Sequence, residues 1–258
     1  MVEPVRVLAL FAHPDDAEFL CAGTLAPLAN RGARIHIVTM TAGDCGSTIL
    51  PPAKITRIRR AEAMRAAKLV KATYTCLEEK DLLVFYDGPT VKKVLELVRR
   101  VNPELVLTHS PVDYMVDHET ASRLCQSACF AAMAPNFRTG ARPPAKAARR
   151  VPHLYYAQAF GGRNIFGDEI RPTLFVDISP TFALKERMLA CHESQQAWLH
   201  AQQDIPRPSH PMREMAERAG ELSGFRLAEG FRQHLGQGFP QDNLLGKLLG
   251  DLVRPVEI

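Results

Sequence analysis

The stretch Ala12-His13-Pro14-Asp15-Asp16-Ala17-Glu18 lies between a short apolar run, residues 5–12, and a segment with helical spacing, residues 17–30. A short apolar run that stops at a proline turn is typical of a buried parallel strand. A second apolar run follows the helical segment at residues 34–41. This order predicts a right-handed parallel crossover. We therefore expect an α/β fold, a Rossmann-like doubly wound and mostly parallel sheet flanked by helices.

The polar residues of this stretch have two interpretations. His13 and Asp16 carry side chains that bind Zn²⁺ in proteins, and Pro14 stiffens the turn between them. Asp15 is then left as a candidate base. Alternatively, the two aspartates cap the helix, because acidic residues at a helix N-terminus interact favourably with the helix dipole. The stretch alone leaves both interpretations open.

Strand and helix patterns alternate along the rest of the chain. Further strands are predicted near residues 73–77, 105–109, 153–160 and 174–178, and helices at about 54–69, 90–101, 180–200 and 209–221, with another that ends near Met133. Residues 134–150 are rich in proline and arginine, which predicts a mobile surface loop or lid. We expect a single domain over residues 1–258, with a core of about 1–180 and a helical C-terminal extension of about 181–258.

A second polar loop follows the strand predicted at residues 105–109 and contains His118. Open parallel sheets bind ligands beyond the carboxyl ends of their strands. If the first and fourth strands are neighbours, His118 lies opposite His13 and Asp16. Two histidines and one aspartate would leave a fourth position of Zn²⁺ open for water, as in catalytic zinc sites. Asp15 is then the natural general base.

Composition excludes several classes of protein. The net charge of +4 is only mildly basic and the charges are spread along the chain, so we expect no nucleic-acid partner. The six cysteines form no CxxC pair and lie mostly in apolar segments, which favours reduced thiols in a cytoplasmic protein. The N-terminus does not resemble a signal peptide and its apolar run is too short to span a bilayer, so we expect no membrane insertion.

Several motifs together resemble the PIG-L/LmbE family of zinc-dependent N-acetylglucosaminyl deacetylases. They are residues 12–18, Ala-Gly-Thr-Leu-Ala at 22–26, Thr-Ala-Gly-Asp-Cys-Gly at 41–46, Arg-Arg-Ala-Glu at 59–62 and Pro-Val-Asp-Tyr-Met-Val-Asp-His at 111–118. The resemblance extends weakly to His192-Glu193-Ser194-Gln195 and to Ala228-Glu229-Gly230-Phe231. It covers the first half of the chain strongly.

The resemblance implies roles for single residues. His13, Asp16 and His118 would bind Zn²⁺, although another divalent metal such as Fe²⁺ stays open, and Asp15 would be the catalytic base. Arg59 corresponds to a family arginine that contacts the substrate, often an anionic part.

Arg59 has an alternative, an exposed helix arginine paired with Glu62. Asp81 would bind a sugar hydroxyl. Asp113 would bind substrate or fix its loop, and Tyr114 is a further candidate for substrate binding. Asp117 is expected to orient a ligand or cap the helix.

One position departs from the family pattern. The family motif ends in His-x-Asp-His, and its first histidine is expected to stabilise the oxyanion or protonate the amine. Met115 occupies that position here and can do neither. Either the zinc acts alone, or Tyr114, His109 or His192 takes the role.

These observations predict a metal-dependent hydrolase that removes an acetyl group from an N-acetylated amino sugar or its glycoside. The expected partner is this small-molecule sugar, and analogy with the family leaves a homo-oligomer open. Two alternatives remain. The same metal site could hydrolyse another amide or an ester, or the chain could be a non-catalytic sugar-binding homologue.

Overall fold

A single mixed sheet runs through the molecule. The computed structural model describes residues 3–203 and 209–256, and within them the strand order is β3-β2-β1-β4-β5-β7-β6-β8. The strands are β1 (Arg6–Phe11), β2 (Arg34–Thr41), β3 (Thr73–Glu79), β4 (Leu105–Thr108), β5 (His153–Ala157), β6 (Leu174–Asp177), β7 (Ala228–Gln233) and β8 (Val253–Pro255).

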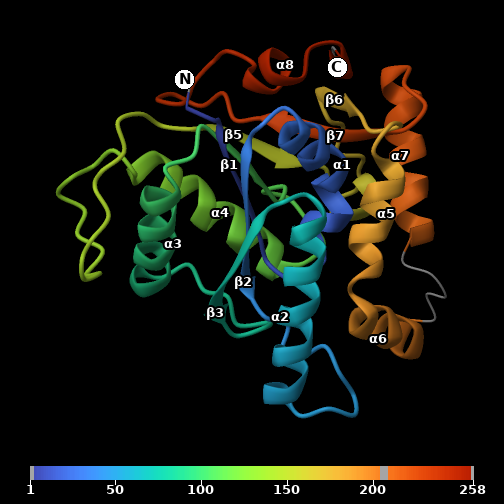
Figure 1. The fold of residues 1–258 in the computed structure, drawn as a ribbon, viewed down its shortest axis with the longest axis horizontal. Helices are drawn as coiled ribbons and strands as arrows, with labels where there is room; N and C mark the ends of the chain where they lie inside the picture. Colours follow the sequence, from blue (N-terminus) through green and yellow to red (C-terminus); the bar gives the residue numbers. More distant parts are fainter. Residues whose placement is uncertain (1–2, 204–208, 257–258) are drawn as a thin grey trace.

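Helices cover both faces of this sheet (Figure 1). They are α1 (Asp16–Asn30), α2 (Pro52–Leu69), α3 (Gly88–Val101), α4 (Val116–Ala131), α5 (Phe182–Ala190), α6 (Glu193–Gln203), α7 (Ser209–Ser223) and α8 (Leu244–Leu249), with short 3-10 turns η1 (Phe160–Gly162) and η2 (Gly250–Leu252). Within the described ranges, none of the helices combines the length and apolar character needed to cross a membrane.

The sheet is parallel from β1 to β5, the strands that come first in the sequence. Strands β3, β2, β1, β4 and β5 pair in parallel, whereas β7 runs antiparallel to both of its neighbours, β5 and β6, and β8 is antiparallel to β6. Strands β2 and β3 lie on one side of β1, toward one edge of the sheet. Strands β4 and β5 lie on the other side of β1. The predicted α/β fold is confirmed, and the strand order reverses between β1 and β4.

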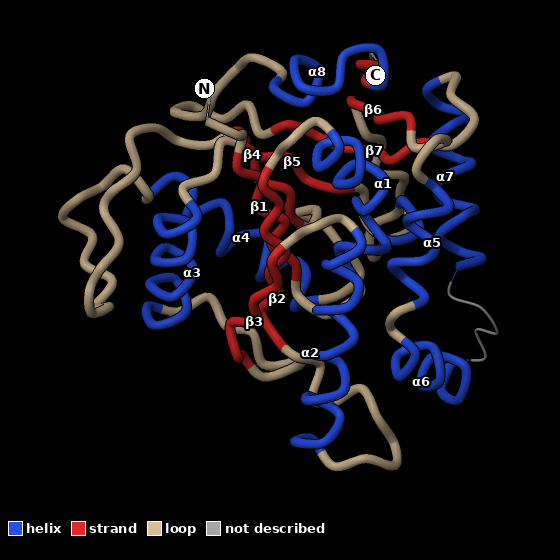
Figure 2. The backbone as a smooth tube through the Cα atoms, viewed as in Figure 1, coloured by secondary structure: helices blue, strands red, loops and turns tan. Residues whose placement is uncertain are grey.

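Strand β1 is buried on both faces, which explains its continuous apolar sequence. Val7, Ala9 and Phe11 point into the core under α1, α2 and α5, and Leu8 and Leu10 into the core under α3 and α4. Figure 2 shows the strands as a central layer between these two groups of helices. The alternation follows from the two-residue period of a strand.

A buried carboxylate fastens the C-terminal part to helix α1. Glu229 on β7 accepts hydrogen bonds from the backbone N–H groups of Gly23 and Thr24, at 2.9 and 2.7 Å, and from the Thr24 hydroxyl at 2.6 Å. Lys185 on α5 pairs with the same carboxylate, and both charged side chains are buried. The polar motif around Glu229 therefore has a structural role, holding β7 and α5 against α1.

The prediction that residues 181–258 form a helical extension is only partly correct. This segment also contributes β7 and β8 to the sheet, and the helix predicted at 180–200 is divided into α5 and α6 at residues 191–192. The sequence of β7, Ala-Glu-Gly-Phe-Arg-Gln, does not alternate between apolar and polar residues, because its glutamate is buried as a charged partner. Its strand character therefore depends on tertiary contacts.

The proline- and arginine-rich loop at residues 134–150 packs against α3 and does not act as a lid in this structure. Arg99 on α3 donates to the backbone carbonyls of Ala132, Ala134 and Phe137. Among the described residues, those that line the cavity identified below include none from this loop. The loop is irregular as predicted, but its place in the fold is away from the candidate site.

Candidate active site

The loops that follow β1 and β4 meet where the strand order reverses. Leu10 on β1 pairs with Thr108 on β4, so the residues that follow the two strands leave the sheet at the same edge. The N–H of Ala12 donates to Nε2 of His109 at 3.0 Å. Such a reversal point is where open α/β sheets bind ligands. The expected adjacency of the first and fourth strands is therefore present.

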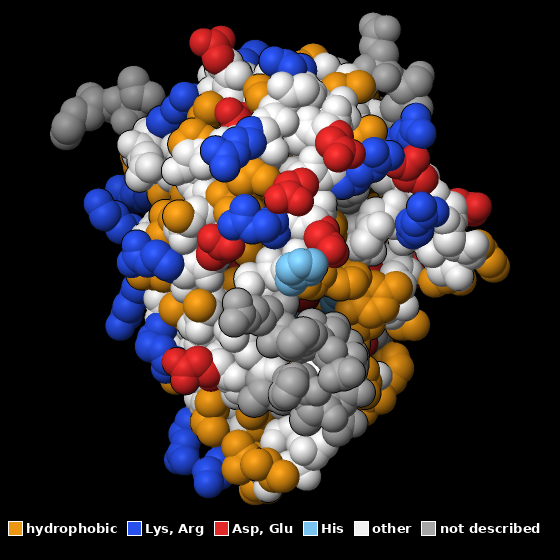
Figure 3. Space-filling view, turned by 90° about the vertical axis from the view of Figure 1, so that its right-hand side faces the viewer, with side chains coloured by type: hydrophobic (Ala, Val, Ile, Leu, Met, Phe, Trp, Pro, Cys, Tyr) orange, Lys and Arg blue, Asp and Glu red, His pale blue; other side chains and the backbone are white. Residues whose placement is uncertain are grey.

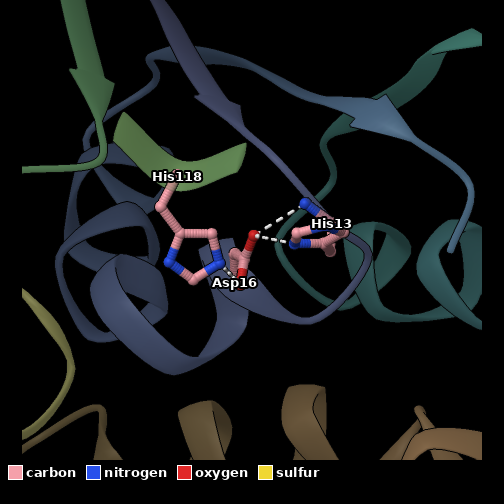
Figure 4. Close-up of side chains that lie close together, drawn as sticks. All are labelled: His13, Asp16 and His118. Atoms are coloured by element: carbon pink, nitrogen blue, oxygen red, sulfur yellow. Dashed lines mark hydrogen bonds and ion pairs between the residues drawn. The ribbon is translucent and has the colours of Figure 1, made fainter. Parts of the chain in front are cut away.

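His13, Asp16 and His118 point toward one another at this edge (Figure 4). Their ligand-type atoms all lie within 4.8 Å of one another. Asp16 is central: its Oδ2 is 3.4 Å from Nδ1 of His13 and its Oδ1 is 3.6 Å from Nε2 of His118. Asp16 also accepts the N–H of His13 at 2.6 Å, which fixes the turn between them.

The second ring nitrogen of each histidine faces a carboxylate. Nδ1 of His118 is 2.9 Å from Oδ1 of Asp113, and Nε2 of His13 is 2.9 Å from Asp81 and 3.3 Å from Asp117. Carboxylates in these positions orient the imidazoles of metal sites and raise their basicity. Their presence fits a metal site that uses Nδ1 of His13 and Nε2 of His118.

The charge balance of the cluster favours a cation. Burial acts to lower the pKa of His13, but its hydrogen bonds with Asp117, Asp16 and Asp81 outweigh burial and hold the pKa well above its ordinary value. Three carboxylates around one imidazole therefore attract positive charge, which a divalent ion would supply. The donor set of two nitrogens and one oxygen suits Zn²⁺ or a similar metal.

Two other trios of possible ligands overlap with this one. They are His109, Asp113 and His118, and His13, Asp81 and Asp117. Among the described residues, the cavity wall includes neither His109 nor Asp113 nor Asp117. His13, Asp16 and His118 all line the cavity, so of the three trios theirs is the one with every member at the cavity wall.

Asp15 does not act as a helix cap through its side chain. It occupies the N-cap position of α1 with φ 96° and ψ −24°, in the left-handed region, and its side chain makes no capping hydrogen bond. For a residue other than glycine this conformation costs about 1–3 kcal/mol and is common at functional sites. Burial raises the pKa of Asp15 to about 6. The positive charge of Arg59, 3.6 Å away, acts in the opposite direction and is outweighed by burial. The capping alternative is therefore not supported for Asp15.

Arg59 is buried in the site, so the alternative of an exposed helix arginine paired with Glu62 is wrong. Its guanidinium donates to the carbonyls of Pro14 at 2.9 Å and Gly43 at 3.5 Å, and Glu62 accepts instead from Ser194. The glycines of the loop at 41–46 make room for it. A Cβ on Gly43 would lie 2.0 Å from Nη1 of Arg59.

The remaining residues predicted to bind substrate have different positions. The carboxylates of Asp81 and Asp113 face His13 and His118, and Asp113 does not belong to the cavity wall. Of the two roles expected for Asp113, its contacts correspond to fixing the loop. Tyr114 lines the cavity, with its ring edge toward His118 at a centroid distance of 5.4 Å.

The three residues considered as replacements for the histidine missing at Met115 are not equivalent. His109 is fully buried and stacks on His118, and burial together with the charge of His118 lowers the pKa of His109 to about 4. His192 is buried 3.5 Å from Glu18. Of the three, the cavity wall includes only Tyr114, within the described residues, and Met115 lies beside it.

The cavity above the cluster has a volume of about 540 Å³. Sequence patterns did not identify much of its wall, which includes Phe19, Phe160, Trp198 and Leu199. These residues lie on α1, η1 and α6, and no local pattern links them. A lone tryptophan on a helix is more often a packing residue, and here Trp198 contributes to this wall.

Comparisons with known proteins agree with this geometry. Residues 8–129 match the family described as PIG-L, GlcNAc-PI de-N-acetylase. The 4-oxalmesaconate hydratase of Pseudomonas putida is 29% identical over 197 residues, 73% of each chain. The diacetylchitobiose deacetylase of Thermococcus kodakarensis is 28% identical over 235 residues, 88% of this chain and 82% of its own.

The fold is also that of a solved relative. The N,N'-diacetylchitobiose deacetylase from Pyrococcus horikoshii superposes with a TM-score of 0.75 at 24% identity, over 89% of this chain and 83% of that one. The resemblance that the motifs predicted is thereby confirmed, at the level of domain type and fold.

Proposed function

Because residues 8–129 form a PIG-L/LmbE-type domain, we propose that this protein removes the acetyl group from an N-acetylated amino sugar or its glycoside by hydrolysis. The observation that carries the proposal is the convergence of His13, Asp16 and His118 on a cavity that also contains Asp15. The similarity to deacetylases of acetylated sugars supports the substrate class.

His13, Asp16 and His118 would hold a divalent metal, with Zn²⁺ the first candidate. When bound, such an ion polarises a carbonyl and makes water more acidic. Asp113 orients His118, and Asp81 and Asp117 orient His13, so both imidazoles are held in place by the protein.

Asp15 removes the proton from the water that attacks the acetyl carbon. Its pKa, raised by burial to about 6, allows it to hold that proton and return it to the nitrogen as the C–N bond breaks. This second step matters here because Met115 has no proton to donate. Tyr114, on the same wall, is the candidate to stabilise the oxygen of the tetrahedral intermediate.

The decisive experiment combines metal analysis with an acetate-release assay. Asp15→Asn should retain the metal and lose about 10²–10⁴-fold in kcat, the contribution typical of a general acid–base group. His13→Ala should lose both metal and activity. Turnover by Asp15→Asn equal to that of the unmodified protein would remove Asp15 from the mechanism.

A second candidate function is the addition of water to an activated carbon–carbon double bond. Met115 favours it, because hydration has no amine leaving group to protonate. The similarity to 4-oxalmesaconate hydratase also supports it. Ultraviolet absorbance of a conjugated unsaturated dicarboxylate would fall on hydration, whereas an acetylated sugar would release acetate. Incubating the metal-loaded protein with each compound distinguishes the two functions.

A further inference from the structure

The segment His192-Glu193-Ser194-Gln195 joins α5 to α6, and the proposed reaction gives it no role. Figure 1 shows α6 at the edge of the molecule, below α5, and Figure 3 views the molecule from this side, where hydrophobic side chains form a group. In the part of α6 whose side chains are described, residues 193–196, 198 and 199, none is buried. No buried side chain of its own therefore anchors this part of the helix.

Two buried carboxylates from other helices hold the segment instead. Glu62 on α2 accepts two hydrogen bonds from Ser194, one from its backbone N–H at 2.9 Å and one from its hydroxyl at 2.6 Å. Glu18 on α1 lies 3.5 Å from Nε2 of His192, and both of these side chains are buried. A carboxylate at the start of a helix satisfies a free N–H group and interacts favourably with the helix dipole. Glu62 therefore caps α6 from a neighbouring helix.

The two helices that Glu62 links both carry residues of the cavity wall. Arg59 lies one turn before Glu62 on α2, Gln195 follows Ser194 on α6, and both Arg59 and Gln195 line the cavity. A Cβ on Gly46 would lie 2.6 Å from Nη1 of Arg59 and 3.4 Å from Oε1 of Gln195, so the ends of these two side chains approach the same glycine. The link between Glu62 and Ser194 therefore sets how Gln195 is placed relative to the guanidinium.

The rest of the α6 contribution to the cavity depends on the same link. Trp198 and Leu199 lie one turn after Gln195 on α6 and also line the cavity. Arg59 is fastened separately, by two backbone carbonyls, and the histidines of the metal-type cluster are held by their own carboxylates. A shift of α6 would therefore move part of the cavity wall and leave the three proposed metal ligands in place.

We propose that Glu62 is a positioning residue, which through Ser194 holds α6 and its three cavity residues where substrate binding needs them. This inference rests on the proposed deacetylation and gives the motifs at 59–62 and 192–195 a common role. Among the described residues that line the cavity, Glu62 is not present, so its effect passes through the helix. Loss of Glu62 should weaken substrate binding and leave the chemical step unchanged.

The test measures KM and kcat of the metal-loaded protein with N-acetylglucosamine. Glu62→Ala removes both hydrogen bonds to Ser194, and we expect KM to rise about tenfold while kcat and metal content stay unchanged, the pattern of lost binding. Glu62→Gln keeps an oxygen that accepts the N–H and gains an amide that donates to the hydroxyl, so KM should return to within about threefold of the unmodified protein.

Glu96→Ala is the matched control. Glu96 on α3 also accepts one hydroxyl and one backbone N–H, from Thr139 at 2.7 Å and from Ala145 at 2.8 Å. It fastens the loop at 134–150, which contributes no described residue to the cavity wall, so Glu96→Ala should lower stability without changing KM. Ser194→Ala removes the hydroxyl bond alone and should raise KM about threefold, which keeps the test decisive if Glu62→Ala does not fold.

A second readout needs no turnover. Trp198 is the only tryptophan of the chain and lies one turn after Ser194 on α6, so its fluorescence reports on this helix. Acrylamide should quench it more strongly in Glu62→Ala and Ser194→Ala than in the unmodified protein. Quenching in Glu96→Ala should be unchanged.

The outcomes separate the two proposals. Unchanged KM in folded Glu62→Ala and Ser194→Ala, with or without a change in quenching, would overturn the positioning role and leave deacetylation intact. A fall in kcat at unchanged KM would overturn it as well. If the unmodified protein does not cleave N-acetylglucosamine, that result counts against deacetylation, and the quenching of Trp198 then supports or overturns the hold of Glu62 on α6.

Discussion

The cavity is lined by a polar cluster, His13, Asp16 and His118, and by an apolar wall, Phe19, Tyr114, Phe160, Leu189, Trp198 and Leu199, and the two are built differently. In the cluster, His13, Asp16 and His118 each have further polar partners, so that their rings and carboxylate are held in fixed orientations. In the apolar wall, Phe160 and Tyr114 contact each other only through ring surfaces and are partly exposed. Hydrogen bonds and ion pairs therefore fix the orientation of the cluster side chains, whereas packing alone positions the rings of Phe160 and Tyr114.

The two regions share α1 and the loop after β4, which carry Phe19 and Tyr114 beside the cluster residues, but the wall also includes residues from later in the chain. The cluster residues follow β1 and β4 in the parallel half of the sheet: His13 lies in the loop after β1, Asp16 at the start of α1 and His118 in the first turn of α4. Leu189, Trp198 and Leu199 come from α5 and α6, after the parallel strands are complete. This difference teaches that the part of the cavity wall on α5 and α6 belongs to a later segment of the chain than the cluster, so its residues can vary without a change in the cluster residues.

Apart from substitutions of the proposed metal ligands or of the proposed base, Asp113→Ala is expected to have the largest effect on the reaction. Removing the carboxylate that faces Nδ1 of His118 should lower metal affinity or activity about 10–100-fold, because the imidazole loses its fixed orientation. Asp113→Asn keeps an oxygen that can accept from His118 and should lose less. Metal titration and kcat/KM of both variants check this, and unchanged affinity in Asp113→Ala would show that the cluster does not depend on its outer carboxylates.

A smaller effect is expected from Gly43→Ala. The new Cβ would lie 2.0 Å from Nη1 of Arg59, so the guanidinium must leave its present position beside Asp15 and kcat/KM should fall. Gly32→Ala is the matched control, since Gly32 also has positive φ but a Cβ there would meet no atom within 4 Å. Both variants should lose about 1–2 kcal/mol of stability from backbone strain.

Thermal unfolding and kinetics of the two glycine variants distinguish strain from displacement of Arg59. A fall in kcat/KM for Gly43→Ala alone would support the position of Arg59 in the site. An equal fall in both would mean that the strain, and not the guanidinium, limits the reaction.

The smallest effect on the reaction is expected from Lys185→Met, although its effect on stability is large. Lys185 and Glu229 are a buried pair, so removal of the ammonium leaves an uncompensated carboxylate and should cost about 3–5 kcal/mol in unfolding free energy. Lys247→Met, at an exposed pair with Asp242, should cost at most about 1 kcal/mol.

Metal affinity of the folded Lys185→Met protein should remain unchanged, because the pair does not contact the cluster. Denaturant unfolding and metal titration measure the two quantities. A large loss of metal affinity would contradict the separation of the cluster from the C-terminal part of the molecule.

Local patterns predicted most of the fold in the parallel half. The apolar runs at 34–41 and 105–109 correspond to β2 and β4, because a strand buried on both faces needs a continuous apolar sequence. Strand β7 has no such pattern. Its Glu229 is acceptable in the core only because Lys185 and the N–H groups of α1 surround it, and no local pattern contains those partners.

The candidate site also contains features that the sequence predicted and features that it could not predict. His13, Asp15 and Asp16 could be proposed from one stretch, and His118 from a second stretch with the same order of strand, loop and helix. The burial of Arg59 could not be predicted, since the residues that enclose it, Pro14 and Gly43, are distant in sequence.

The sequence by itself determined the type of fold, the residues of the polar cluster and the departure at Met115, because each depends on short segments with strong local chemistry. The tertiary structure decided which carboxylate faces which histidine, that Tyr114 rather than His109 or His192 lines the cavity, and what covers the site. Those features depend on which segments the sheet brings together, and strand order is a property of the whole chain.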